Sequence, residues 1–183
     1  RISGPKAIAI ADSMFRGRHK LADAKGYTLH YGDIVYDNGD VLDDVIVALF
    51  RTPHSYTGED SVEITIHGSE YITSELIRLA IERGAVMATP GEFTQRAFLT
   101  GKMDLSRAEA VADIIASDSR WSHNVASTQM RGSYSKRLGT MRESLLRLCT
   151  LLELELDFSE EDVEFADRTE LRKMLVNIGS EVA

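Results

Sequence analysis

The sequence lacks the features that mark secreted, disulfide-bonded or membrane proteins. Its 183 residues include a single cysteine, Cys149, so no disulfide can form within the chain. It contains no uninterrupted apolar run of about 18 residues, the length that spans a membrane, and no signal peptide is visible. We therefore expect a cytoplasmic protein with no membrane partner. Cys149 lies in an apolar helical stretch, which favours an inert thiol in the core.

Positive charge is also scarce. Lys and Arg number 21 against 29 Asp and Glu, a net charge of −8 that argues against a broad phosphate-binding surface and leaves room only for a local basic patch. No G-x-x-x-x-G-K-[ST] motif occurs, so the chain should hold neither a nucleotide-phosphate loop nor the catalytic residues of a GTPase. The five histidines share no metal-ligand spacing, and the acidic residues 157–164 lack the spacing of a calcium loop. We expect no metal site.

What is present predicts an α+β domain over residues 1–100. The hydrophobic fraction of 43% is sufficient for a real core. Strand patterns occupy residues 27–35, 45–50, 61–67 and 85–88, the second of them a continuous apolar run that suggests a buried strand, and Asn38-Gly39 is a hairpin turn signal. Residues 72–83 form an amphipathic helix pattern that Gly84 closes, and Ser3 is placed to cap a helix that begins near Pro5.

Residues 101–183 show a helical pattern, which predicts the start of an all-α domain. The apolar stripe of one long helix runs over residues 133–156, and a last helix is expected from about residue 167. The last helical pattern has no terminator, and Arg1 follows no visible strand although residues 1–5 resemble the end of one. We expect the chain to be a truncated fragment of a longer protein.

Two segments contain runs of glycine, charged and polar residues that packing of a core does not require. Residues 55–64 read SYTGEDSVEI and residues 89–105 read TPGEFTQRAFLTGKMDL. Loops of this kind usually build a site on a stable scaffold. Their candidate site residues are Glu59, Asp60, Glu63, Pro90, Gly91, Glu92 and Lys102. Each also has a structural interpretation: a solvated strand residue for Glu63, turn formers for Glu59 and Asp60, a first-turn helix residue for Glu92 and a surface lysine for Lys102.

The motifs of the chain closely resemble those of the N-terminal part of one family, the MnmE (TrmE) tRNA modification GTPases. The resemblance rests on nine collinear stretches: residues 1–5 (RISGP), 53–60 (PHSYTGED), 62–64 (VEI), 67–68 (HG), 90–94 (PGEFT), 96–99 (RAFL), 101–105 (GKMDL), 108–113 (AEAVAD) and 157–164 (DFSEEDVE). They cover nearly the whole chain. Thr100 and Ser69 depart from the residues that many members carry.

This resemblance implies a mixed-sheet folate-binding domain that is similar to the glycine cleavage T protein and dimerises, followed by a helical domain. In the full-length parent a GTP-binding domain, with magnesium and potassium, is inserted in the helical domain, and a cysteine motif ends the chain. The family acts with the flavoprotein MnmG (GidA) on the wobble uridine of certain tRNAs. It installs an aminomethyl-type group at carbon 5, using a one-carbon folate of the 5-formyltetrahydrofolate type.

The resemblance assigns folate contacts to Arg1, Glu63 and Lys102, with Glu59, Asp60, Pro90, Gly91 and Glu92 as pocket neighbours. The chemistry agrees, because a pterin presents an amino group and a ring N–H side by side, and a carboxylate such as Glu63 accepts both. Arg1 and Lys102 suit the anionic tail or the carbonyl. Two alternatives stay open: a stand-alone folate-dependent one-carbon transferase, and a non-catalytic dimerisation module whose polar loops are structural.

Overall fold

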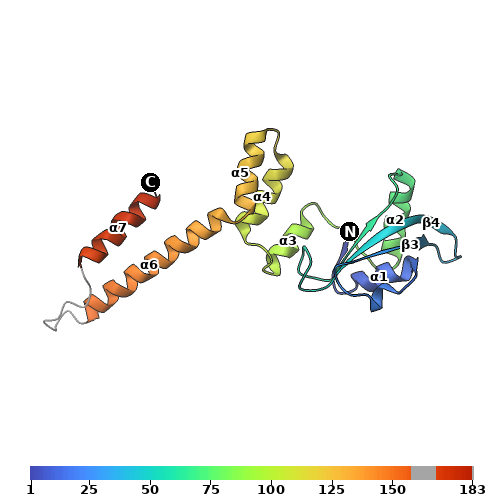
Figure 1. The fold of residues 1–183 in the computed structure, drawn as a ribbon, viewed down its shortest axis with the longest axis horizontal. Helices are drawn as coiled ribbons and strands as arrows, with labels where there is room; N and C mark the ends of the chain where they lie inside the picture. The colour runs from blue at the N-terminus through green and yellow to red at the C-terminus, as the bar shows by residue number, and fades with distance from the viewer. Residues whose placement is uncertain (158–167, 183) are drawn as a thin grey trace. The chain divides into compact units, whose positions relative to one another are not determined.

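The computed structural model describes residues 1–157 and 168–182, and it divides into two compact units, residues 1–108 and 109–183 (Figure 1). The first unit contains β1 (Ile2–Ser3), α1 (Ala7–Met14), β2 (Phe15–Gly17), the 3₁₀ turn η1 (Leu21–Asp23), β3 (Thr28–Val35), β4 (Val41–Phe50), β5 (Ser61–Thr65), α2 (Glu70–Glu82) and α3 (Glu92–Leu99). The helices α4 (Leu105–Ala116), α5 (Arg120–Met130), α6 (Ser133–Asp157) and α7 (Arg168–Val182) follow. The domain boundary between residues 100 and 101 stays a prediction.

The sheet of the first unit is antiparallel throughout, so the expectation of a mixed sheet is wrong. Its strand order is β1-β5-β4-β3-β2, and all four pairings are antiparallel. Strands β2 to β5 follow one another in sequence and pair as neighbours, and β1 joins the free side of β5. A mixed sheet needs a strand that returns through a crossover helix, and no described residue after α2 in this unit forms one.

The segment 85–88, predicted as such a strand, is extended chain without strand pairing. The N–H of Ala85 donates to the carbonyl oxygen of Ala80 at 2.9 Å, which satisfies the end of α2. Val86 and Met87 are 90% and 63% exposed. A run of four apolar residues is therefore not enough to define a strand when no neighbouring strand offers its backbone.

The alternation of β4 places one face of the sheet in the core. Val45, Val47 and Leu49 are at most 1% exposed, whereas Ile46 between them is 45% exposed. The continuous apolar run at residues 45–50 is thus a strand buried on one face only. Such one-sided burial is typical of antiparallel sheets.

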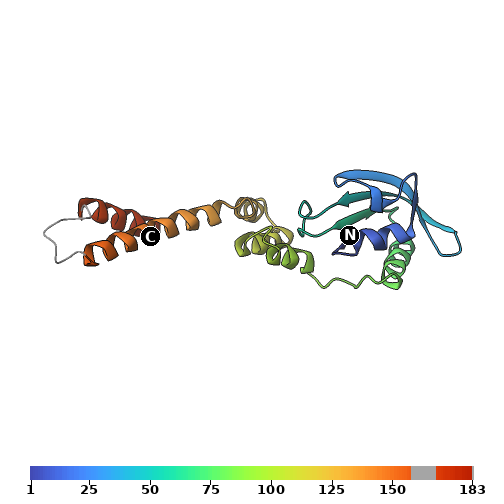
Figure 2. The same ribbon diagram turned by 90° about the horizontal axis from the view of Figure 1, so that it is seen from below.

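Helices α1 and α2 cover the buried face of the sheet (Figure 2). Met14 of α1 and Leu79 of α2 pack into the same apolar core as the inward residues of β4. The hydroxyl of Ser69 caps α2, and Gly84 follows its end at φ 95°, so the predicted helix and its terminator are confirmed. Ser3 does not cap α1, because its backbone is extended in β1, opposite Ser61.

The second unit is helical, as predicted. Helix α6 contacts both α5 and α7, and α6 and α7 lie side by side in both views (Figures 1 and 2). The expected long helix and last helix are α6 and α7. Residues 158–164 of the acidic segment lie outside the described residues.

Cys149 is exposed, so its expected place in the core is wrong. Leu148, its neighbour in α6, is buried at 7% exposure, so the two adjacent side chains point in different directions. None of the described helices is long and apolar enough to cross a membrane.

Candidate functional site

Two of the predicted site residues meet directly in the first unit. The Arg1 guanidinium donates from Nε and Nη2 to Oε1 of Glu63, at 2.7 and 2.6 Å. Arg1 precedes β1 and Glu63 lies in β5, and the antiparallel pairing of these strands brings the two side chains together across 62 positions. Both side chains are about 40% exposed, which keeps them accessible from solvent.

Two aromatic rings flank the same guanidinium. Cζ of Arg1 lies 5.1 Å from the ring centroid of Tyr56 and 5.5 Å from that of Phe93. Distances below about 6 Å allow cation–π attraction. The hydroxyl of Tyr56 forms a 2.9 Å hydrogen bond with the hydroxyl of Thr94 on α3, which fixes the orientation of its ring.

The loop between β4 and β5 is held by a cluster of hydroxyl groups. Ser3 Oγ lies 2.6 Å from Thr57 Oγ1 and 2.9 Å from Ser61 Oγ. Thr57 is fully buried, and its carbonyl oxygen accepts from Thr100 Oγ1 at 2.6 Å. These bonds connect β1, the loop that carries Tyr56 and the end of α3.

Arg96 links the two predicted polar segments. Its guanidinium donates to Oε1 of Glu92 at 2.8 Å and to Glu59 at 3.3 Å. The Arg96 hydrogen bonds, helped by the N–H of Thr89, lower the pKa of Glu92 below its ordinary value. Glu59 and Glu92 therefore act first as anchors between the loop and α3.

Asp60, Pro90 and Gly91 shape the backbone around the site. Asp60 Oδ1 accepts from the N–H of Thr52 at 2.8 Å, which closes the 52–60 loop. Gly91 caps α3 with φ 81°, a left-handed conformation that favours glycine. Pro90 precedes it in the exposed turn.

Lys102 lies against the same loop, next to Gly58. It follows Gly101, and its N–H donates to the carbonyl oxygen of Ala97 at 2.9 Å. A Cβ added to Gly58 would lie 3.0 Å from Lys102 Cγ and 2.8 Å from Thr100 Oγ1. The close approach of the residue 100–102 turn therefore depends on glycine at position 58, and the Lys102 ammonium group stays exposed.

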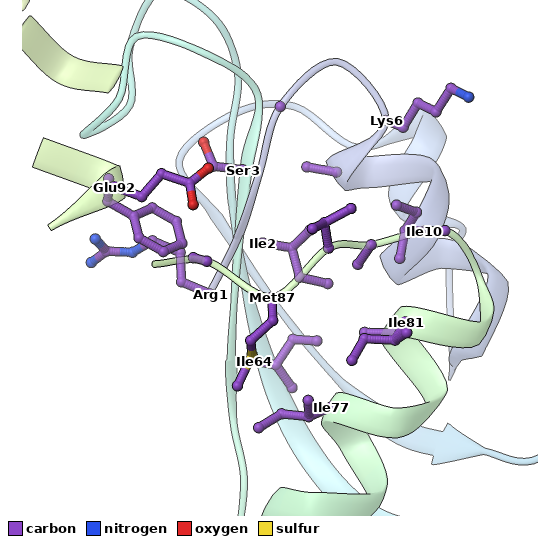
Figure 3. Close-up of a pocket in the computed structure, with 18 of the residues that line it drawn as sticks. Arg1, Ile2, Ser3, Lys6, Ile10, Ile64, Ile77, Ile81, Met87 and Glu92 are labelled. Atoms are coloured by element: carbon purple, nitrogen blue, oxygen red, sulfur yellow. The ribbon is translucent and has the colours of Figure 1, made fainter. Parts of the chain in front are cut away.

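A cavity of about 650 Å³ opens between β1, α1, α2 and the segment 85–88. Its walls are mainly apolar, and Arg1 and Glu92 lie at one end (Figure 3). Arg96 also lines the cavity. Apart from Arg1 and Glu92, no residue predicted for the site is among the cavity residues in the described chain. Glu63 points away because neighbouring strand residues alternate, and Ile64 faces the cavity instead.

Three site residues were missed in the sequence: Tyr56, Phe93 and Arg96. The spacing of Glu92 and Arg96 is the i,i+4 spacing of a helical ion pair and could have identified the third. The two aromatic residues carried no signal beyond their place inside the motifs. Within residues 1–157 and 168–182, no group of three or more acidic, histidine or cysteine side chains could hold a metal ion.

The arrangement is suited to a planar group with adjacent N–H donors. Glu63 already accepts two N–H groups of a planar guanidinium, and two aromatic rings lie within 5.5 Å of the Cζ atom of that guanidinium. The aminopyrimidine edge of a pterin has the same donor pattern, so the residues present fit the head of a folate.

Two family models match the chain. The model described as "GTP-binding protein TrmE N-terminus" matches residues 1–102, and the "MnmE helical domain" model matches residues 105–183. Among similar curated proteins, tRNA modification GTPase MnmE of Bacteroides fragilis is 55% identical over 100% of this chain and 40% of its own length. The protein of the same name from Bacteroides thetaiotaomicron is 57% identical over 95% of this chain and 38% of its own.

A more distant relative, tRNA modification GTPase MnmE of Chlorobaculum tepidum, is 47% identical over 100% of this chain and 39% of its own length. The chain thus spans about two-fifths of the length of these relatives. Both family models and these relatives agree on the same assignment across the two units. The chain therefore belongs to the MnmE (TrmE) family, with its N-terminal region followed by residues of the helical domain.

Proposed function

We propose that this chain is the reduced-folate-binding and dimerisation region of a tRNA modification GTPase. In this proposal the whole protein acts with the flavoprotein MnmG to install an aminomethyl-type group at carbon 5 of the wobble uridine. GTP, magnesium and potassium bind in the whole protein outside residues 1–183. The first unit then corresponds to the folate domain of the glycine cleavage T protein, and the site of action is the cytoplasm.

The observation that carries the folate proposal is the Glu63 carboxylate, which accepts two N–H groups of one planar side chain, that of Arg1. Two aromatic rings lie within 5.5 Å of the Cζ atom of the same side chain. A folate of the 5-formyltetrahydrofolate type offers the same pair of donors from its pterin. Its anionic tail suits a cation, and Lys102 and Arg1 are the cations assigned to it. Lys102 supports this role because its side chain is exposed next to the loop that carries Tyr56.

The test measures folate affinity and stability together, in the whole protein. Glu63→Ala should weaken 5-formyltetrahydrofolate binding roughly tenfold to hundredfold, because a hydrogen bond to a charged group contributes about 1.5–3 kcal/mol. The unfolding free energy should fall by less than about 1 kcal/mol, since the Arg1–Glu63 pair is half-exposed. Calorimetric titration and melting curves separate the two effects.

Glu82→Ala is the matched control. Glu82 is also an exposed glutamate paired with an arginine, Arg78, but it lies on α2 away from the loop. Its removal should leave folate affinity unchanged. If Glu63→Ala and wild type bind folate equally well, Glu63 is only a solvated strand residue. If wild type binds no folate at all, the non-catalytic dimerisation module becomes the better explanation.

A further inference from the structure

The Arg1 guanidinium lies in a cage of three side chains that come from separate parts of the fold. Glu63 of β5 accepts its N–H groups at 2.6–2.7 Å, and the rings of Tyr56 and Phe93 lie 5.1 and 5.5 Å from Cζ. The folate contacts and pocket neighbours implied by the resemblance do not include Tyr56 or Phe93. Their presence around one planar cation therefore needs its own explanation.

The walls of this cage are fixed independently of Arg1. Tyr56 is bonded to Thr94 through its hydroxyl group. Phe93 lies in the first turn of α3, between Glu92 and Thr94, and the Arg96 bonds to Glu92 and Glu59 anchor that turn to the loop. Both rings are half-buried rather than freely rotating surface groups. A preformed cage of this kind recognises flat groups at a small entropic cost.

A guanidinium and the aminopyrimidine edge of a pterin share the properties that this cage recognises. Both are planar, both direct two N–H donors toward one carboxylate, and both present a face to an aromatic ring. Arg1 thus occupies Oε1 of Glu63, one of the two carboxylate oxygens that a pterin edge would engage. The same Glu63 oxygen cannot serve both groups at full strength.

We infer that Tyr56 and Phe93 are the stacking walls of the pterin subsite, and that Arg1 and the pterin compete for Glu63 within it. This inference rests on the proposed folate function. Pterin binding moves the Arg1 guanidinium off Glu63 and makes it available to the carbonyl or carboxylate groups of the ligand. Arg1 therefore weakens binding of the pterin head and strengthens binding of the rest of the folate.

The experiment titrates the whole protein with three probes: 5-formyltetrahydrofolate, 6-hydroxymethylpterin for the head, and p-aminobenzoylglutamate for the tail. Tyr56→Leu and Phe93→Leu should each weaken the first two probes roughly fivefold to thirtyfold, the range of aromatic stacking on a base. Their effect on the tail probe should be less than about twofold. Tyr56→Phe keeps the ring and loses only the Thr94 bond, so it should stay within about threefold of wild type and serves as the control.

Arg1→Met tests the competition. It removes the internal competitor and should bind 6-hydroxymethylpterin at least about threefold more tightly than wild type. Melting curves identify any variant that fails to fold. Tyr56→Leu and Phe93→Leu each remove a different ring, so one folded variant is enough for the test. Equal folate affinity in wild type and both leucine variants overturns the stacking walls while leaving the proposed function intact. Weaker pterin binding by Arg1→Met overturns the competition, whereas absence of folate binding in wild type contradicts the proposed function itself.

Discussion

Gly58 shows how a single residue sets the geometry of the site. It has φ 79°, and a Cβ there would meet Thr100 Oγ1 at 2.8 Å and Lys102 Cγ at 3.0 Å. Gly58→Ala therefore combines a strained backbone with a steric clash. We expect the unfolding free energy to fall by about 2–4 kcal/mol, since an unfavourable backbone conformation alone costs about 1–3 kcal/mol.

Gly39→Ala is the control for backbone strain. Gly39 also has a positive φ, 89°, but an added Cβ would meet nothing within 4 Å. Urea denaturation of both variants isolates the clash as the difference between them. Equal losses would mean that the turn at residues 100–102 moves aside without cost.

The pair of His67 and Asp43 should make stability depend on pH. His67 Nδ1 lies 2.8 Å from Asp43 Oδ1, and the His67 N–H donates to Oδ2 at 2.9 Å. The bond to Asp43 raises the pKa of His67 above its ordinary 6.5. Burial acts to raise the pKa of Asp43, but the two His67 hydrogen bonds outweigh it and lower that pKa below 3.8.

The signs of these shifts define the pH window. The His67 contribution is complete below pH 6.5 and is lost as the pH rises through its folded pKa. The Asp43 contribution is complete above pH 3.8 and is lost as the pH falls through its folded pKa. The pair is thus most stabilising between these values. Melting temperatures of His67→Asn should fall less than those of wild type between pH 6 and pH 8, whereas the loop variant His19→Asn should follow wild type.

The residue types at the site could be predicted, but their partners could not. Glu63, Arg1 and Lys102 stand in recognisable motifs. The bond from Arg1 to Glu63 joins residues 62 positions apart, and only the β1–β5 register decides that they meet. The aromatic neighbours of Arg1 were unpredictable for the same reason, since a ring inside a motif does not say what it faces.

At the scale of elements, Arg96 is the residue that joins α3 to the loop at residues 55–60. Its partners Glu92 and Glu59 lie on these two different elements. Arg96→Met should therefore loosen the loop more than it lowers overall stability. Because Arg96 is 40% exposed, the loss in unfolding free energy should be about 1 kcal/mol or less.

Hydrogen exchange of the loop amides is the decisive measurement for Arg96→Met, and we expect it to be faster in residues 55–60. Arg78→Met is the matched control. Arg78 also binds two glutamates, but both Glu75 and Glu82 lie on its own helix, α2. Unchanged exchange in the loop of Arg96→Met would show that the hydroxyl cluster alone holds it.

Strands and helices with strong periodic signals were confirmed, including β3, β4, α2 and α6. The segment 85–88 was predicted wrongly because an apolar run forms a strand only when a neighbouring backbone is available. The sheet type was also wrong, since strand pairing depends on connections that periodicity does not report. Cys149 was misplaced because a helix rotates its neighbours by about 100° per residue, so adjacent positions face different surroundings.

At the scale of the whole molecule, the first unit leaves apolar surface that a second copy could cover. Leu29, Tyr31 and Ile46 are 73%, 71% and 45% exposed on the sheet face opposite α1 and α2. Tyr31 and Ile46 are paired neighbours on β3 and β4. On the other side of β5, β1 pairs only with Ser61 and Val62, which leaves part of that edge open.

We therefore expect a homodimer formed through the first unit. Light scattering of the whole protein at micromolar concentration should give twice the monomer mass. Tyr31→Lys should weaken the dimer at least about tenfold, because a lysine in an apolar interface loses hydration. Ile115→Lys changes an equally exposed apolar residue of the second unit and is the control. A monomer mass for wild type at all concentrations would contradict the prediction.

The pairing of β1 with β5 also decides when the candidate site comes into existence during folding. Strands β2 to β5 are joined by short connections and can pair early, whereas β1 must wait until a loop of some 60 residues has closed. We therefore expect Glu63 to acquire its contact with Arg1 late in folding. A ligand of this site binds only completed molecules, and at a hundred times its dissociation constant it would stabilise them by about 2.7 kcal/mol.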